Sequence, residues 1–457
     1  MSPDLPGYDE AAAMVAAYGA RLARMRPSSE RVELGLAAGR VLAQPLCADR
    51  DQPPFARSTR DGFACRALEA SRHRFLRLAG ASRAGDAPAG PLTQGTVWEI
   101  MTGAPVPTGA DAVMMIEHVE QAGAEVRLLP PRKIKKGENV VAQGAQALAG
   151  DELLSAGTAI HSAQIALAAA CGYAALEVFI RPRVAILATG DELVPVESSP
   201  APGQIRNSNA PMLAAMVETA GGEPWVLPTA ADDPQSLDAA LAQAADASLL
   251  LITGGVSAGK FDLVEPALAR AGARFHFTGV RIQPGKPLVF GELPVRNAPT
   301  VQTEFGAKCF FGLPGNPVSS AVTFLLFAAP VLAALAGRLE TGPRFTLARL
   351  AAKAAKHGKP GLTRFLPASC TFGGTANDSA HELSDLGAPS FPRSLRKGWE
   401  STTLPPGRID SQLPEVALVP MQGSGDLAAL ARSNCFLVVP EEAHNLDTGA
   451  IVRILLP

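Results

Sequence analysis

Three acidic residues in the middle of the chain each follow a turn-forming segment. Glu192 follows a Thr-Gly pair, Asp232 follows the run WVLPTAA, and Asp262 follows a glycine-rich run. Carboxylates suit a hard divalent cation such as Mg²⁺, which takes oxygen ligands and often bridges to a substrate phosphate. Aspartates also cap helices, and Asp-Asp-Pro at 232–234 is a typical cap sequence. Metal binding by Glu192, Asp232 and Asp262 and simple capping therefore both stay open.

The glycine-rich run 254–260, GGVSAGK, matches the first seven positions of a phosphate-binding loop. The next residue is Phe261, where that motif needs a hydroxyl to hold Mg²⁺, so we do not expect a nucleoside-triphosphatase. Small residues such as Gly254, Gly255 and Ser257 still let backbone N–H groups approach an anion. The alternative is a tight strand-to-helix turn without a ligand.

Two further turns are stiffened by proline. QPGKP places Lys286 on a rigid turn, and LPGNPVSS brings Asn316 and Ser319 close to Pro314 and Pro317, of which Pro317 suits a first helical turn. Each could present polar groups to a ligand, or be only a hairpin lysine and a rigid helix start.

The elements that must position these residues are apolar runs that end at each turn. They are VAILA at 184–188, SLLLI at 248–252, RFHFTGVRI at 274–282 and CFFGL at 309–313. Helical stretches separate them, which predicts a doubly wound, mostly parallel sheet. Ligands on such sheets bind outside the carboxyl ends of the strands, so the four turns predict an anion site at one edge.

The remaining sequence predicts three other parts. An amphipathic helix is expected from Tyr8 to Met25, and short strands over 74–139 predict a β-rich module. Short strands after Arg344 predict a small barrel. A Pro-, Ser- and Arg-containing stretch at about 386–410 is expected to be an inserted, partly disordered loop.

Composition excludes several classes of protein. The 457 residues carry a formal net charge of −2, which gives no basic footprint for nucleic acid. The six cysteines form no C-x-x-C pair, which favours a reducing compartment over a disulfide scaffold or zinc ribbon. The N-terminus lacks a signal-peptide pattern, and the longest apolar stretch, 321–336, is short for a membrane span of about 20 residues. We therefore expect a cytoplasmic protein.

Several motifs together resemble the molybdopterin molybdenumtransferase family, which includes bacterial molybdenum-insertion proteins and the E domain of gephyrin. The match runs nearly end to end in the family's order. The motifs are DGFA at 61–64, IMTGAPVP at 100–107, KKGENV at 135–140, TGDEL at 189–193, GQIRNSN at 203–209, GGVSAGKFD at 254–262, PGKP at 284–287, LPGNPVS at 313–319 and QGSGDLAALARSNCFLVVP at 422–440.

The resemblance implies an α/β multidomain fold with a central molybdopterin-binding domain, a β-rich module, an extended N-terminal region and a C-terminal β-barrel. It also implies an elongated homodimer. The expected divisions are 1–26 with 44–56 and 140–180 (N-terminal helical and extended region), 27–43 with 57–139 (β-rich module), 181–338 (molybdopterin-binding domain) and 339–457 (β-barrel).

The implied reaction transfers molybdenum from molybdate to adenylylated molybdopterin and releases AMP, with Mg²⁺ as the divalent cation. Such a site needs charge stabilisation and positioning more than a protein nucleophile. A molybdopterin adenylyltransferase and molybdoenzyme chaperones are candidate protein partners, and neither nucleic acid nor membrane is expected.

By position the family's functional acids carry over to Asp61, Glu192, Asp232 and Asp262. Asp61 would reach the site from the partner subunit, although which subunit supplies it is not decided by the sequence. The expected substrate-binding residues are Thr102, Asn139, Gly190, Gly254, Gly255, Ser257, Lys286, Pro314, Asn316, Pro317, Ser319 and Ser424.

The chain departs from the family pattern at four positions. Asn139 stands where Asp is usual, Gly279 and Gln283 stand where lysines are common, and Pro367 stands where some members have Arg. We hypothesise that Arg281 or Arg364 replaces the missing cations near molybdate, because a guanidinium suits a tetrahedral oxyanion. Molybdate and tungstate are not distinguished.

Two other functions stay open at this point. One is the neighbouring adenylyl-transfer step, because the central domain shares that fold. The other is a non-catalytic pterin-binding scaffold, which the missing cations favour and the retained acids oppose.

Overall fold

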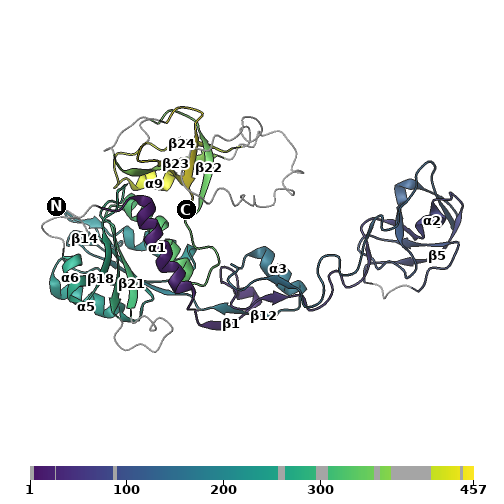
Figure 1. Ribbon diagram of the computed structural model, residues 1–457, viewed down its shortest axis with the longest axis horizontal. Helices are drawn as coiled ribbons and strands as arrows, with labels where there is room; N and C mark the ends of the chain where they lie inside the picture. The colour runs from purple at the N-terminus through teal and green to yellow at the C-terminus, as the bar shows by residue number, and fades with distance from the viewer. Residues whose placement is uncertain are drawn as a thin grey trace. The chain divides into compact units, whose positions relative to one another are not determined.

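The computed structural model describes residues 5–25, 27–85, 90–255, 263–294, 307–354, 361–371, 413–442 and 446–457. The predicted loop at 386–410 and the predicted site residues Ser257 and Asp262 lie outside these ranges. The chain divides into two compact units, Ser29–Val178 and a larger one made of Met1–Ser28 with Phe179–Pro457 (Figure 1). The four-part division made from the sequence stays a prediction.

The smaller unit contains a six-stranded mixed sheet in the order β7-β4-β6-β5-β9-β8, which confirms the β-rich character expected over 74–139. Phe63, Val97 and Val126 are buried in its core. The strands are β4 (Gly62–Cys65), β5 (Leu76–Ser82), β6 (Thr96–Ile100), β7 (Ala112–Met115), β8 (Val119–Ala122) and β9 (Glu125–Leu128), with the short helix α2 (Ala67–Ala70).

Three two-stranded sheets complete this part of the chain, pairing β1 with β12, β2 with β11 and β3 with β10. The β3–β10 pair joins 57–58 to 140–141 and so fixes the segment that precedes β4. The elements are β1 (Ser29–Glu33), β2 (Leu46–Cys47), β3 (Arg57–Ser58), β10 (Val140–Val141), β11 (Glu152–Leu154), α3 (Ser162–Ala170) and β12 (Ala175–Phe179).

The larger unit is built on a six-stranded sheet in the order β16-β13-β17-β21-β20-β18. β13 is parallel to β16 and β17, and β17 is parallel to β21, whereas β20 and β18 are antiparallel to their neighbours. The mostly parallel sheet predicted from the sequence is confirmed. The strands are β13 (Arg183–Ala188), β16 (Glu223–Val226), β17 (Leu249–Thr253), β18 (Arg274–Thr278), β20 (Val289–Pro294) and β21 (Ala307–Leu313).

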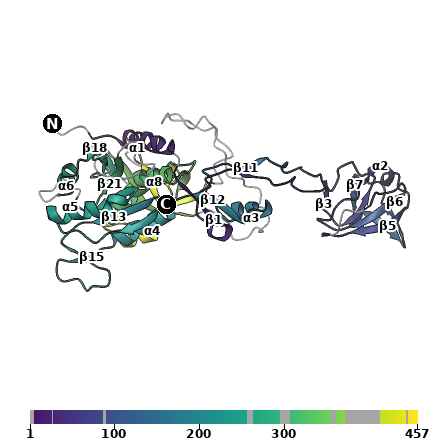
Figure 2. The same cartoon turned by 90° about the horizontal axis from the view of Figure 1, so that it is seen from below.

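Helices cover both faces of this sheet (Figures 1 and 2). Val184 and Ile186 of β13 pack into one core, whereas Ala185 and Leu187 pack into another, as the two-residue period of a strand buried on both faces requires. The helices are α1 (Tyr8–Ala23), α4 (Asn209–Thr219), α5 (Pro234–Gln243), α6 (Val264–Arg270), α7 (Pro317–Thr323) and α8 (Ala329–Leu335).

The third apolar run does not form one strand as the sequence suggested. β18 ends at Thr278, the chain bends at Gly279 with φ +153°, and β19 (Ile282–Gln283) then pairs with β23 of a different sheet. A Cβ at Gly279 would lie 2.9 Å from Leu5 Cδ2, so the bend needs glycine. The turn QPGKP therefore begins at the end of β19 and leads into β20.

The segment Pro317–Leu335 is long and apolar enough to span a membrane, but 89% of it is buried in the larger unit. Burial of this extent is what a core helix shows. A π-helical stretch, Phe324–Ala328, separates α7 from α8 just before Pro330, because proline lacks the N–H that would continue the helical ladder. Helix α1 packs against α8, and Tyr8 and Tyr18 join the same core.

The C-terminal strands close into a five-stranded barrel, because β23 pairs with both β24 and β25. This confirms the predicted barrel. Its elements are β22 (Phe345–Leu350), β23 (Thr363–Thr371), β24 (Glu415–Leu418), α9 (Leu427–Arg432), β25 (Cys435–Val439) and β26 (Ile451–Leu455), and the remaining short pair of the larger unit is β14 (Leu193–Val194) with β15 (Ile205–Arg206).

Candidate active site at the edge of the central sheet

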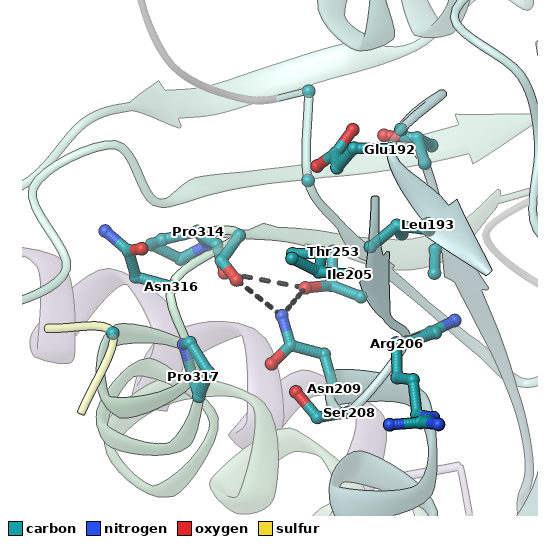
Figure 3. A pocket seen from close by; sticks show the side chains of 18 of the residues that line it. Glu192, Leu193, Ile205, Arg206, Ser208, Asn209, Thr253, Pro314, Asn316 and Pro317 are labelled. Atoms are coloured by element: carbon teal, nitrogen blue, oxygen red, sulfur yellow. Dashed lines mark hydrogen bonds between the residues drawn. The ribbon is translucent and has the colours of Figure 1, made fainter. Parts of the chain in front are cut away.

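A cavity of about 810 Å³ lies at the carboxyl edge of the central strands (Figure 3). All four turns expected there contribute to its wall, so the structure brings them together as the strand pattern predicted. The lining residues are 188–190, 192–193, 205–209, 232, 253–255, 287, 314–317, 425 and 427.

Two glycines shape this wall. Gly190 has φ +144°, and a Cβ there would lie 2.5 Å from Glu192 Oε2. Gly254 has φ +95°, and a Cβ there would clash with the carbonyl oxygen of Thr189. Both positions therefore require glycine, because the Glu192 carboxylate and the Thr189 carbonyl oxygen occupy the space that a Cβ would take.

Asn209, the first residue of α4, joins two of the turns. Its Nδ2 donates to Thr253 Oγ1 at 2.8 Å and to the Gly315 carbonyl at 2.6 Å. In Figure 3 the Asn209 side chain points toward Thr253 and the segment that contains Pro314. This bridge fixes the end of β17 to the end of β21.

Two polar atoms on the cavity wall are buried without a hydrogen-bond partner. They are Asn209 Oδ1, on a residue that is 9% exposed, and Thr189 Oγ1, on a residue that is 3% exposed. Buried polar atoms are normally paired, so these two are unsatisfied groups directly behind the cavity wall.

Helix capping and the cavity are served by different aspartates. Asp233 caps α5, because its Oδ1 accepts from the N–H groups of Gln235 and Ser236, both at 2.9 Å. Asp232 lines the cavity instead, and its N–H donates to Asp191 Oδ1 at 3.0 Å. Burial, followed by the neighbouring Asp191 and Glu192 carboxylates, raises the pKa of Asp232 above its usual range.

Glu192 and Asp232 are the carboxylates on this wall. Among the described residues no group of three His, Cys, Asp or Glu side chains is placed to hold a metal ion, and Asp262 is not among those residues. Two carboxylates together with a substrate phosphate fit the way Mg²⁺ is usually bound, since it keeps several waters.

The structure places the predicted substrate-binding residues Lys286, Ser319 and Ser424 in different surroundings. Lys286 is exposed and does not line the cavity, to which QPGKP contributes Pro287. Ser319 is 4% exposed, and Ser424 Oγ accepts from Asn316 Nδ2 at 2.9 Å. Within the described residues the basic side chain on the cavity wall is Arg206, whose Nε donates to the Ser198 carbonyl at 3.0 Å.

The two arginines hypothesised to replace family lysines do not line this cavity. Arg281 lines a second cavity of about 430 Å³ that also includes Tyr8 and Arg453, and its Nη1 donates to the Leu5 carbonyl at 3.2 Å. Arg364 is 6% exposed within the barrel strand β23.

Asp61 and Thr102 lie together in the smaller unit. Asp61 Oδ1 accepts from the Thr102 N–H at 2.7 Å and from Thr102 Oγ1 at 3.0 Å. These bonds lower the pKa of the exposed Asp61 carboxyl. Asn139 is linked to the segment before Asp61, because its backbone carbonyl accepts from the Thr59 N–H at 3.0 Å. Its backbone φ is +61°, and its Nδ2 donates to the Val113 carbonyl at 2.9 Å.

Sequence reasoning missed several residues on the cavity wall. The polar run Arg-Asn-Ser-Asn at 206–209 leads into α4, which begins at Asn209, and it lies inside the motif GQIRNSN, although its residues were not predicted as site residues. Gly425 and Leu427 come from the C-terminal part of the chain, and no spacing pattern relates them to the central strands.

Three family models match successive segments of the chain. The model described as "MoeA N-terminal region (domain I and II)" matches residues 7–172, "Probable molybdopterin binding domain" matches 185–334, and "MoeA C-terminal region (domain IV)" matches 391–456.

Similar proteins are known by sequence and by structure. A molybdopterin molybdenumtransferase of Nostoc sp. is 38% identical over 315 residues, which are 68% of this chain and 70% of the relative. One of Staphylococcus aureus strain MRSA252 is 30% identical over 434 residues, or 93% and 90%. The crystal structure of the molybdopterin biosynthesis moeA protein of Pyrococcus horikoshii OT3 superposes with a TM-score of 0.72 at 26% identity, covering 99% of this chain and 100% of that one.

Proposed function

The chain belongs to the molybdopterin molybdenumtransferase family, and from this premise we propose that it transfers molybdenum from molybdate to adenylylated molybdopterin with release of AMP. The observation that carries the proposal is the cavity at the sheet edge, where Glu192 and Asp232 face turns built from glycine and proline. A phosphate-linked substrate needs this combination of approachable backbone and carboxylates that hold a cation.

The residues of the cavity divide into two roles in this proposal. Gly190, Gly254 and Gly255 form a part of the wall without side chains, which the substrate can approach, and Asn209 and Thr189 hold this wall in place through their hydrogen bonds to Thr253 and Gly315. Such a wall lowers the barrier by holding the reacting bond in place rather than by attacking it.

Glu192 and Asp232 are proposed to hold Mg²⁺ together with Asp262. When bound, the ion neutralises charge on the phosphate oxygens. The raised pKa of Asp232 means that its carboxyl loses its charge at a higher pH than an ordinary aspartate does. Cation binding is therefore expected to weaken as the pH falls through that value, since the protonated acid is a poor ligand.

A homodimer located in the cytoplasm belongs to the same proposal, with Asp61 acting from the second copy. Mixing D61N subunits with E192Q subunits tests this. If the two acids belong to sites shared between copies, half of the sites in each mixed dimer are intact, and activity returns. If both acids act within one copy, the mixture stays as inactive as the separate variants.

The reaction is tested with the purified full-length protein. Adenylylated molybdopterin with molybdate should give AMP release, whereas molybdopterin with ATP should give no adenylylated product. E192Q should lower the rate by about 10²-fold or more, and Q235A, an exposed change on α5, should leave it unaltered. AMP formation without molybdate dependence would contradict the proposal, and binding of adenylylated molybdopterin without turnover would favour a scaffold.

A further inference from the structure

The Asn139 side chain lies at a crossing of two backbone segments in the smaller unit. Its side-chain Nδ2 donates to the Val113 carbonyl of β7 at 2.9 Å. The backbone carbonyl of Asn139 accepts from the Thr59 N–H at 3.0 Å. Glu138 adds a third link, because its carbonyl accepts from the Val113 N–H at 3.0 Å. The turn that contains Asn139 is therefore attached both to β7 and to the segment before Asp61.

The backbone of Asn139 is held in the left-handed region, with φ +61°. Asparagine tolerates this conformation better than most residues other than glycine. An amide is also required for the bond to Val113, because an ionised carboxylate in its place would face a carbonyl oxygen without a proton to donate. Backbone conformation and hydrogen bonding thus both select asparagine at this position.

The attached segment carries Asp61. Ser58 pairs with Val140. Its N–H donates to the Ala104 carbonyl and its carbonyl accepts from the Gly103 N–H, and both residues belong to the turn that contains Thr102. The Asp61 carbonyl in turn accepts from the Ile116 N–H at 3.2 Å. Asp61 is therefore restrained on one side by the bond of Thr59 to Asn139 and at its own carbonyl by the bond from Ile116. The first of these restraints depends on the turn that contains Asn139.

We propose that Asn139 is a positioning residue, which fixes the 57–61 segment so that the Asp61 carboxylate and Thr102 keep their mutual geometry. This role replaces the direct substrate contact that the sequence suggested for Asn139. The inference rests on the proposed function only where activity is the readout.

Two variants of Asn139 separate side chain from backbone. N139G removes the amide but keeps the left-handed backbone without strain, whereas N139D keeps the shape and removes the donor. We expect AMP release to fall about tenfold in N139G, in kcat rather than in KM for the pterin. In N139D the loss should also be about tenfold at neutral pH, because an ionised carboxylate cannot donate to the Val113 carbonyl.

His73 provides the matched control, as the other non-glycine residue with positive φ among those described. Its φ is +56°, and its Nδ1 lies 3.1 Å from the Leu128 carbonyl on β9, three strands from β4 in the sheet. H73G should lower thermal stability as N139G does but leave kcat unchanged. Equal effects of the two variants on kcat, or a kcat of N139D equal to that of the unaltered protein, would overturn the proposal.

A second readout does not depend on the reaction. Hydrogen exchange at the Thr59 and Gly103 amides should accelerate at least tenfold in N139G and stay unchanged in H73G. If the unaltered protein releases no AMP but this exchange pattern holds, the proposed function fails and the positioning role stands. If exchange at both amides is unchanged in N139G, the positioning role fails whatever the activity.

Discussion

The bridge made by Asn209 offers the most direct test of how the cavity is assembled. Asn209→Ala removes two hydrogen bonds, to Thr253 Oγ1 at 2.8 Å and to the Gly315 carbonyl at 2.6 Å. A hydrogen bond contributes about 1 kcal/mol net, and a buried polar atom left without its partner costs about 1 kcal/mol more. Gly315 is exposed, whereas Thr253 is 2% exposed and keeps a 3.5 Å bond from its Oγ1 to the Pro314 carbonyl, so the additional cost applies only to the accepting side of the threonine hydroxyl. The expected loss is about 2 to 3 kcal/mol in the free energy of unfolding.

The chain contains three tryptophans, and Trp225 lies in β16, at the edge of the sheet that Asn209 supports. Replacing Trp98 and Trp399 with phenylalanine leaves Trp225 as the fluorescence reporter of this unit during unfolding in urea. N209A and its parent are compared in that background. Gln235→Ala, an exposed change on α5, serves as the control and should shift the free energy by less than about 0.5 kcal/mol.

A double-mutant cycle separates the bridge from general damage to the core. Thr253→Val removes the same hydrogen bond from the other side, so the two changes together should cost about 1 kcal/mol less than their sum. AMP binding should weaken in N209A, because the ends of β17 and β21 are no longer fixed to each other. An unfolding free energy for N209A within about 0.5 kcal/mol of the parent, or strict additivity with T253V, would refute the reasoning.

Three other predictions concern the acids and the glycines. Asp232→Asn should abolish Mg²⁺-dependent binding of AMP measured by calorimetry. It should also raise the free energy of unfolding at neutral pH, because the raised pKa of Asp232 contributes stability that is lost as the pH rises through the pKa of the folded state. A lower free energy of unfolding than that of the parent at pH 7 would contradict this. Gly254→Ala should lower the melting temperature and AMP affinity together, since a Cβ meets the Thr189 carbonyl and φ is +95°; retention of both values would show that the turn can relax. Thr102→Val should raise the pKa of Asp61 toward its usual value, as followed by carboxyl chemical shifts, because one of its two hydrogen bonds is lost; an unchanged titration would show that the backbone N–H alone sets it.

The central sheet could be predicted from the sequence because burial on both faces leaves a direct pattern. Continuous apolar runs such as 184–188 cannot be half-exposed strands, and the helical stretches between them require crossover connections. The turns then meet at one edge whatever their detailed conformation. This is why the meeting of the four turns at one edge could be predicted, although several of the residues that line the cavity could not.

The break at Gly279 shows where such reasoning stops. The apolar run 274–282 looks like one strand, but its second half pairs with the barrel strand β23, about eighty residues later in the chain. The glycine is needed because Leu5, near the N-terminus, packs against it. Neither contact leaves a mark in the local sequence, since both join segments that are far apart along the chain.

The two adjacent aspartates show a different limit. Asp232 and Asp233 have the same side chain, and the sequence suits either of them as the cap of α5. Proline at the first helical position makes the preceding residue the cap, which is Asp233. The rule was available, but deciding what the other aspartate faces required the bridge between Ala230 and Thr189, which holds the loop beside Gly190.

The charge on the cavity wall constrains how an anionic substrate can be held. Among the described lining residues Glu192 and Asp232 carry two negative charges and Arg206 one positive charge, which leaves the wall with a net charge of −1. Phosphate groups would be repelled by this wall unless a cation lies between them and the two carboxylates. The glycines on the wall carry no charge and do not remove that repulsion. Affinity for AMP should therefore depend more on a divalent cation than on Arg206, because one guanidinium offsets only half of the acidic charge.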